Sequence, residues 1–196
     1  MGFWQNKNGQ GIVLNYSGAN CQSLKNWLNQ FNAFSDLAAT TCGSSPSLGA
    51  TTGSGVTGYV YGVIKAATCS SPTNTCNAML KAQMLATALD VYFSNPSLGG
   101  NRISASAPIG GVTIDLTKIC AMIDGSGGSS CSGSYENVSS VFGGANSMTV
   151  MNMLLYQNTA DPLGDGGAVW YAQNKAKQVL AKDAFDAINN QVAFSP

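Results

Sequence analysis

The stretch NTCNAMLKAQMLATALDVYFSNP, residues 74–96, decides the fold. Four of its polar side chains fall on one narrow stripe at 100° per residue: Gln83, Thr87, Asp90 and Ser94. Nearly every other side chain in the segment is apolar. A helix that is apolar over most of its circumference must be surrounded by other elements, so the pattern predicts a central helix. Pro96 and the glycine pair after it predict where that helix ends.

Lys81 is the exception in this helix, because it projects opposite the polar stripe. Its ammonium group could reach solvent along the first turns. It could instead be buried against an acid, since an unpaired buried charge is expensive. An isopeptide crosslink, as in a surface adhesin, would need an Asn or Asp partner and a catalytic acid.

Patterns on both sides of the central helix predict further elements. Apolar or amphipathic spacing indicates helices at about 21–32, 56–67, 148–157 and 167–193. The stretch VTIDL, 112–116, reads as a short strand, and Thr117 as the N-cap of a helical turn carrying Ile119, Met122 and Ile123. We therefore expect one domain, 1–196, that is mainly α. It would have four to five helices, little strand, long Gly/Ser/Thr-rich loops, and an irregular segment 1–20 packed on the helical core.

The cysteines indicate the compartment. An even number in a weakly charged chain favours three disulfides formed under oxidising conditions, and six cysteines allow fifteen pairings. The nearest-neighbour set is favoured: Cys21–Cys42, Cys69–Cys76 and Cys120–Cys131. Buried free thiols are the alternative. A zinc site is disfavoured, because the chain lacks both histidine and a C-x-x-C pair.

Composition limits the partners. The apolar fraction is 44%, but only 9% of residues are charged and the formal net charge is zero. Nucleic acid demands a basic surface, so it is not expected as a partner, and neither is an anionic membrane. No apolar run is long enough to span a bilayer, and no signal peptide is visible. We expect an excised module of a longer exported protein, at the cell surface or outside the cell.

The absence of histidine removes Ser-His-Asp and Cys-His catalysis and every His general base. Carboxylates remain. Glu136, the sole glutamate, and Asp115 are the alternative catalytic residues, as a carboxylate-dependent glycoside hydrolase would use. Acids in loops are also commonly caps or solvated surface groups.

The stretch NTADPLGDGG, 158–167, is the candidate cation site. Asn158, Asp161 and Asp165 could supply hard oxygen ligands to calcium. In the competing interpretation, Asp161 and Pro162 form a turn and Asp165 caps the helix that follows. No other cofactor is expected.

The opening GFWQNKNGQG, 2–11, carries the candidate ligand-binding residues. Phe3 and Trp4 would either anchor this segment to the core or form a stacking platform for sugar rings. In the second case Gln5 and Asn6 would supply hydrogen bonds beside the rings.

This opening resembles the Gly-aromatic-Trp-Lys-Asn-His start of a family of bacterial extracellular domains. The matching residues are Gly2, Phe3, Trp4 and Asn6, with Gln5 in place of the usual Lys and Lys7 in place of the usual His. MLKAQMLATALDVY, 79–92, and IGGVTIDLTKI, 109–119, resemble later parts of the family. The resemblance implies an extracellular bacterial module without an established activity, and it supplies no catalytic residue.

Together these features predict a non-catalytic structural or binding module of a secreted or surface bacterial protein, for adhesion or glycan recognition. A polysaccharide or a surface protein would be the partner. The alternatives are the glycoside hydrolase and a self-associating surface-layer or filament subunit.

Overall fold

The computed structural model describes residues 1–15, 21–44, 53–69, 75–123 and 130–194. These residues are mainly helical, and their α-helices are α1 (Gly2–Gln5), α2 (Lys7–Asn15), α3 (Gln22–Leu28), α4 (Gly55–Lys65), α5 (Asn77–Ser94), α6 (Val150–Ala160) and α7 (Lys175–Asn189). Four short strands accompany them: β1 (Thr113–Asp115), β2 (Ile119–Ala121), β3 (Ser134–Glu136) and β4 (Ser147–Thr149). Short 3-10 turns are η1 (Asn32–Phe34), η2 (Ile109–Gly111), η3 (Ser139–Val141), η4 (Tyr171–Gln173) and η5 (Val192–Phe194).

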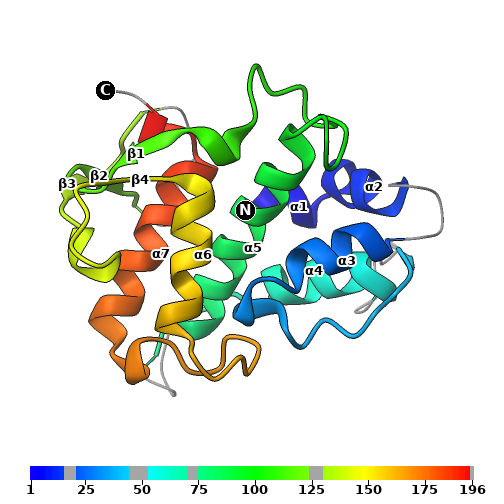
Figure 1. Ribbon diagram of the computed structural model, residues 1–196, viewed down its shortest axis with the longest axis horizontal. Coiled ribbons are helices and arrows are strands. Elements are labelled where there is room, and N and C mark those ends of the chain that lie inside the picture. Colours follow the sequence, from blue (N-terminus) through cyan, green and yellow to red (C-terminus); the bar gives the residue numbers. More distant parts are fainter. Residues whose placement is uncertain (16–20, 45–52, 70–74, 124–129, 195–196) are drawn as a thin grey trace.

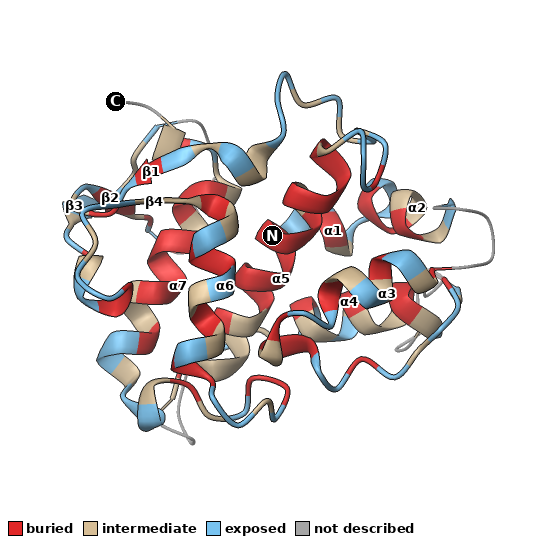
Figure 2. Cartoon of the chain, viewed as in Figure 1, coloured by how far each residue is buried: buried red, intermediate tan, exposed pale blue. Residues whose placement is uncertain are grey.

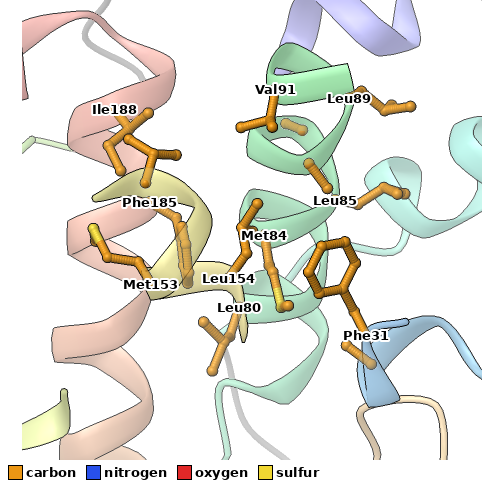
Figure 3. Packing of buried hydrophobic residues seen from close by; sticks show 14 of the residues in the cluster. Phe31, Leu80, Met84, Leu85, Leu89, Val91, Met153, Leu154, Phe185 and Ile188 are labelled. Carbon is orange, nitrogen blue, oxygen red and sulfur yellow. The ribbon is translucent and has the colours of Figure 1, made fainter. Parts of the chain in front are cut away.

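The predicted central helix is confirmed as α5. It runs through the middle of the molecule, with α6, α7 and the strands on one side and α1 to α4 on the other (Figure 1). Most of its circumference is buried (Figure 2). Leu80 and Met84 of α5 lie in the same apolar cluster as Leu154 of α6 and Phe185 of α7 (Figure 3). Each such side chain contributes about 1.5–3 kcal/mol when fully buried, so this seam holds the helices together.

The described residues form seven α-helices rather than the expected four to five. Five of them correspond to the predicted helices, and the extra two are α1 and α2. The expectation of an irregular segment over 1–20 is therefore wrong for residues 2–15, while 16–20 lie outside the described residues.

Tertiary contacts explain why this glycine- and asparagine-rich segment is helical. Trp4 is buried, and its carbonyl accepts a hydrogen bond from the Gln10 side chain at 2.7 Å. Asn6 caps α2, because its side-chain oxygen accepts hydrogen bonds from the amides of Asn8 and Gly9. A Cβ on Gly9 would lie 2.7 Å from Trp4 Cα, so the close approach of α2 to α1 requires glycine.

The strand prediction near residue 113 is confirmed, but the helical turn after Thr117 is not formed. β1 pairs antiparallel with β4, and β2 pairs antiparallel with β3, with Ile119 opposite Glu136. Thr117 donates from both its amide and its hydroxyl to Asp115 Oδ1, which makes a turn between β1 and β2. The chain therefore enters a second strand at the point where a helix was expected.

The last helix begins at Lys175 rather than near 167. Tyr171, Ala172 and Gln173 all have positive φ, a left-handed turn that cannot continue into an α-helix. Asn174 then caps α7 by accepting a hydrogen bond from the Lys177 amide.

The predicted disulfides Cys21–Cys42, Cys69–Cys76 and Cys120–Cys131 are all present. They are compatible with an extracellular or secreted protein. None of the helices in the described ranges has the length and apolar character needed to cross a membrane. Much of the Ser/Gly/Thr-rich sequence expected to form long loops, 45–52 and 124–129, lies outside the described residues.

Candidate functional site

The polar stripe of α5 is buried at Gln83, Thr87 and Ser94 and half-buried at Asp90, and it meets other elements along its whole length. Gln83 Nε2 donates to Asp186 Oδ1 of α7 at 2.8 Å, and Thr87 Oγ1 donates to Asn189 Oδ1 at 2.9 Å. Ser94 Oγ accepts a hydrogen bond from the Ile109 amide at 2.9 Å. The stripe is therefore an internal polar seam and not a solvated face, and it leads along α5 toward Asp90.

Asp90 is the residue of this stripe that meets the N-terminal segment. Its Oδ1 accepts a hydrogen bond from Trp4 Nε1 at 2.9 Å. The Trp4 ring stacks on Phe93, with ring centroids 5.4 Å apart. Burial raises the pKa of Asp90 from 3.8 to about 6, although the bond from Trp4 acts in the opposite direction. A carboxylate that is costly to ionise is thus held in place by a rigid aromatic pair.

A cavity of about 800 Å³ opens beside Asp90 and Trp4. Its walls come from α1, the C-terminal end of α5, the segment between α5 and β1, and the C-terminal end of α7 with η5. In Figure 1 the segment between α5 and β1 is the green chain that arches above α5 and α1. Apolar side chains in the walls include Phe3, Ile103, Ile109, Ile188 and Phe194; polar or charged ones are Asp90, Arg102, Ser104, Ser106, Asn189 and Gln191.

Strained backbone accompanies this cavity. Ser104 and Gln191, which both line it, have φ of 53° and 62°. Nearby Asn101, with φ of 47°, holds the loop by exchanging side-chain hydrogen bonds with the backbone of Ala105. Left-handed conformations of residues other than glycine each cost on the order of 1 kcal/mol or more, and they concentrate at binding sites.

A second cavity of about 480 Å³ adjoins the first, since Ile12 and Arg102 line both. Its other lining residues belong to α2 and include Lys7 and Asn15. The combined surface therefore offers a carboxylate at one end and two cationic side chains toward the other.

The structure brings two of the four predicted ligand-binding residues to this cavity. Phe3 is 40% exposed and lies edge-on to buried Trp4, with centroids 5.0 Å apart. Gln5 and Asn6 line neither cavity, and Asn6 serves as the cap of α2. The sequence placed Asp90 on the polar stripe but did not assign it to a site. The feature that could have indicated a site is a carboxylate on an otherwise apolar central helix.

The predicted cation residues lie in the turn after α6. Asp161 is fully buried, and neither of its carboxylate oxygens has a hydrogen-bond partner among the described residues. Burial and the neighbouring Asp165 raise its pKa to about 6. Asn158 is not available to a cation, because its side chain bonds the backbone of Gln30 and Asn32. Asp165 caps the turn itself, accepting from the amides of Ala168 and Val169, and α7 begins later.

Lys81 lies beside this turn. It is paired with an acid, as expected if the lysine is buried and does not reach solvent. Its ammonium contacts Asp36 Oδ2 and the Gly166 carbonyl, each at 2.7 Å. Only 12% of the Lys81 side chain is exposed, against 48% for Asp36.

Glu136 and Asp115 are placed in different surroundings. Asp115 is exposed in its turn, where hydrogen bonds from Thr117 lower its pKa. Burial, together with the charge and hydrogen bond of Asp183, raises the pKa of Glu136 to about 7. Asp183 is itself paired with Lys182. The carboxyl that faces Glu136 is therefore Asp183, and neither cavity is lined by any of these acids.

Among the described residues, no group of three or more His, Cys, Asp or Glu side chains converges as a metal centre. Comparison with protein-family models, with curated proteins and with solved structures finds no match. The resemblance of the opening segment to a bacterial extracellular family therefore stays a prediction.

Proposed function

We propose that this chain is a non-catalytic binding module of a secreted or surface protein, and that its ligand is a glycan held in the cavity beside Asp90. The observation that carries the proposal is the cavity of about 800 Å³ in which an exposed aromatic ring and a half-buried carboxylate converge. Ligand pockets are typically of this size, with apolar walls and a few placed polar groups.

The lining suits a sugar better than a purely apolar ligand. Phe3 is 40% exposed and lines the cavity, so the apolar C–H face of a sugar ring could stack on its ring. Asp90 can accept hydrogen bonds from hydroxyl groups, and Arg102 can donate them. The second cavity extends the surface past Arg102, which provides room for an oligosaccharide rather than a single residue.

The rigidity of the site also supports binding. Trp4 is fixed by its bond to Asp90, by Phe93 and by the Gln10 contact to its carbonyl. A pocket that is formed before the ligand arrives loses less conformational entropy on binding.

Glycoside hydrolysis receives less support from the same geometry. It needs two carboxyl groups on either side of a scissile bond. Asp90 is the carboxylate that lines the larger cavity, whereas Glu136 of β3 and Asp183 of α7 lie next to each other and do not line it.

The test is a glycan-array screen of the purified chain, followed by calorimetric titration of any sugar that binds. Phe3→Ala and Arg102→Ala should each weaken binding by tenfold or more, with folding checked by circular dichroism. Tyr135→Ala is the matched control, because Tyr135 is 59% exposed on β3 and does not line the cavity. Equal affinities in all three variants would contradict the proposal, as would failure of every glycan to bind.

Light scattering across a concentration series addresses the remaining alternative, a self-associating subunit. A monomer at all concentrations would agree with the proposed binding module. Concentration-dependent growth that Phe3→Ala abolishes would instead show that the cavity face joins copies of the chain.

A further inference from the structure

We infer that Asp161 and Asp165 bind calcium at the turn that follows α6. The inference is independent of the glycan proposal, because neither residue lines the cavity beside Asp90. It rests on the burial of Asp161, the lack of partners for its oxygens and the net charge of the surrounding side chains.

Asp161 is the unusual group. Its exposed fraction is 0%, and both Oδ1 and Oδ2 are without a hydrogen-bond partner among the described residues. A buried carboxylate without partners costs several kcal/mol when it is ionised, so such groups are normally paired or coordinate a metal. The Asp165 carboxyl and the Gly167 amide lie near the Asp161 carboxyl: the charge and hydrogen bond of Asp165 raise its pKa and the Gly167 amide lowers it, so the Asp161 carboxyl is directed into the turn.

Asp165 leaves one oxygen for a cation. Its Oδ1 accepts the amides of Ala168 and Val169. Its other oxygen, Oδ2, could join the Asp161 oxygens around a metal ion. Backbone carbonyls of the turn and water would complete the coordination, which calcium accepts because it takes six to eight oxygens in flexible geometry. Magnesium demands a near-ideal octahedron and fits an irregular turn less well.

The local charge has the right sign and size. Asp36, Asp161 and Asp165 bring three negative charges and Lys81 brings one positive charge, which leaves a formal −2 when all are ionised. Lys81 pairs with the more exposed Asp36 and with the Gly166 carbonyl, and its charge also acts on buried Asp161, so it offsets one of the three negative charges. A divalent cation would neutralise the charge that remains on Asp161 and on exposed Asp165.

The scaffold around the turn is already fixed. The Asn32 side chain donates to the Asp161 carbonyl at 2.7 Å, and Ser35 Oγ donates to the Gly164 carbonyl at 2.6 Å. Gly166 has φ of 74°, and a Cβ there would lie 2.8 Å from Asp36 Cγ, so the turn passes close to the η1 segment. These contacts fix the carboxylates before an ion arrives, which reduces the entropic cost of binding.

The experiment is titration of the chelator-treated chain with calcium chloride at about pH 7.5, followed by calorimetry and thermal unfolding. We expect one ion per chain with a dissociation constant of about 0.1–1 mM, the range of extracellular calcium modules. At ten times that concentration the melting temperature should rise by about 3–5 °C. Magnesium at the same concentration should produce less than half of that rise.

Asp161→Asn and Asp165→Asn should each weaken calcium binding by tenfold or more, while Asp115→Asn, in an exposed turn, should leave it unchanged. Asn can keep the cap at 165, so loss of binding there would not reflect loss of the turn. The inference is overturned if calcium neither binds nor raises the melting temperature up to about 10 mM, or if it binds all three variants equally. Stabilisation by Asp161→Asn without any calcium effect on the parent chain would also overturn it, because the two acids would then share a proton.

Discussion

Asp90→Asn should stabilise the protein at neutral pH, even though it alters a half-buried, hydrogen-bonded residue. Burial raises the pKa of Asp90 from 3.8 to about 6 despite the Trp4 bond. A difference of this size corresponds to about 3 kcal/mol between the ionised and neutral forms. Asn resembles the neutral form and its oxygen can still accept the Trp4 N–H, so the expected gain in unfolding free energy is about 1–3 kcal/mol.

The effect of Asp90→Asn on stability depends on pH in a defined way. The folded chain keeps the Asp90 proton up to about pH 6, whereas the unfolded chain releases it near 3.8. Between these values the folded state binds more protons, so stability falls as pH rises. The cost of the carboxylate is fully present above pH 6 and is absent below 3.8. Because Asn does not ionise, the advantage of Asp90→Asn should follow the same window.

Urea unfolding at about pH 7.5 and about pH 3.5 measures both quantities, with the window set by linkage. Asp115→Asn is the control of opposite sign, because hydrogen bonds from Thr117 lower the pKa of Asp115. The stabilisation by the Asp115 charge is fully present above the pKa of Asp115 in the unfolded chain. It is lost as pH falls through the lower pKa of Asp115 in the folded chain. If Asp90→Asn destabilises the chain at neutral pH, or changes stability equally at both pH values, then ionising the Asp90 carboxylate does not cost the folded state free energy.

Two further perturbations test the fold. Gly9→Ala should lower the free energy of unfolding, measured in urea, by more than about 2 kcal/mol, because its Cβ would lie 2.7 Å from Trp4 Cα. The control is Gly11→Ala on the same helix, which has nothing within 4 Å of its Cβ and should be neutral or stabilising. Equal effects of the two substitutions would contradict the close approach of α2 to α1. Removing Cys21–Cys42 by double Ala substitution should cost about 3 kcal/mol and removing Cys69–Cys76 about 2 kcal/mol, because the bridges span 21 and 7 residues; the reverse order in urea unfolding would contradict this loop-entropy account.

The sequence predicted α5 well because the apolar pattern and the polar stripe both lie within this one helix. Its apolar circumference required neighbours on every side, and the four-residue polar stripe was visible from spacing alone. What each polar group faces was not predictable, because Gln83, Thr87 and Asp90 find partners about 86 to 106 residues away. The disulfides were predictable because each cysteine lies nearest in sequence to its partner.

The errors share a physical cause, which is that tertiary contacts outweighed local propensity. Glycine and asparagine in 1–15 indicated irregular chain, yet Trp4 burial and the fit at Gly9 make it helical. Thr117 looked like a helix cap, but its hydroxyl is used on Asp115. Asp183 was missed as the neighbour of Glu136 because it lies within a helix whose pattern gave no reason to suspect it.

The candidate site could be predicted only in fragments, since its walls come from segments distant in sequence. Phe3 and Trp4 were recognised as candidates, but the strain at Ser104 and Gln191 has no signature in the sequence. These residues and Asp90 are each individually unfavourable, and they meet at one cavity. Folding alone gives no reason to concentrate such costs in one place, whereas a ligand that contacts all three groups would offset them together. The same reasoning applies to Asp161, whose buried carboxyl lies beside the acid Asp165, an arrangement that a bound cation would make less costly.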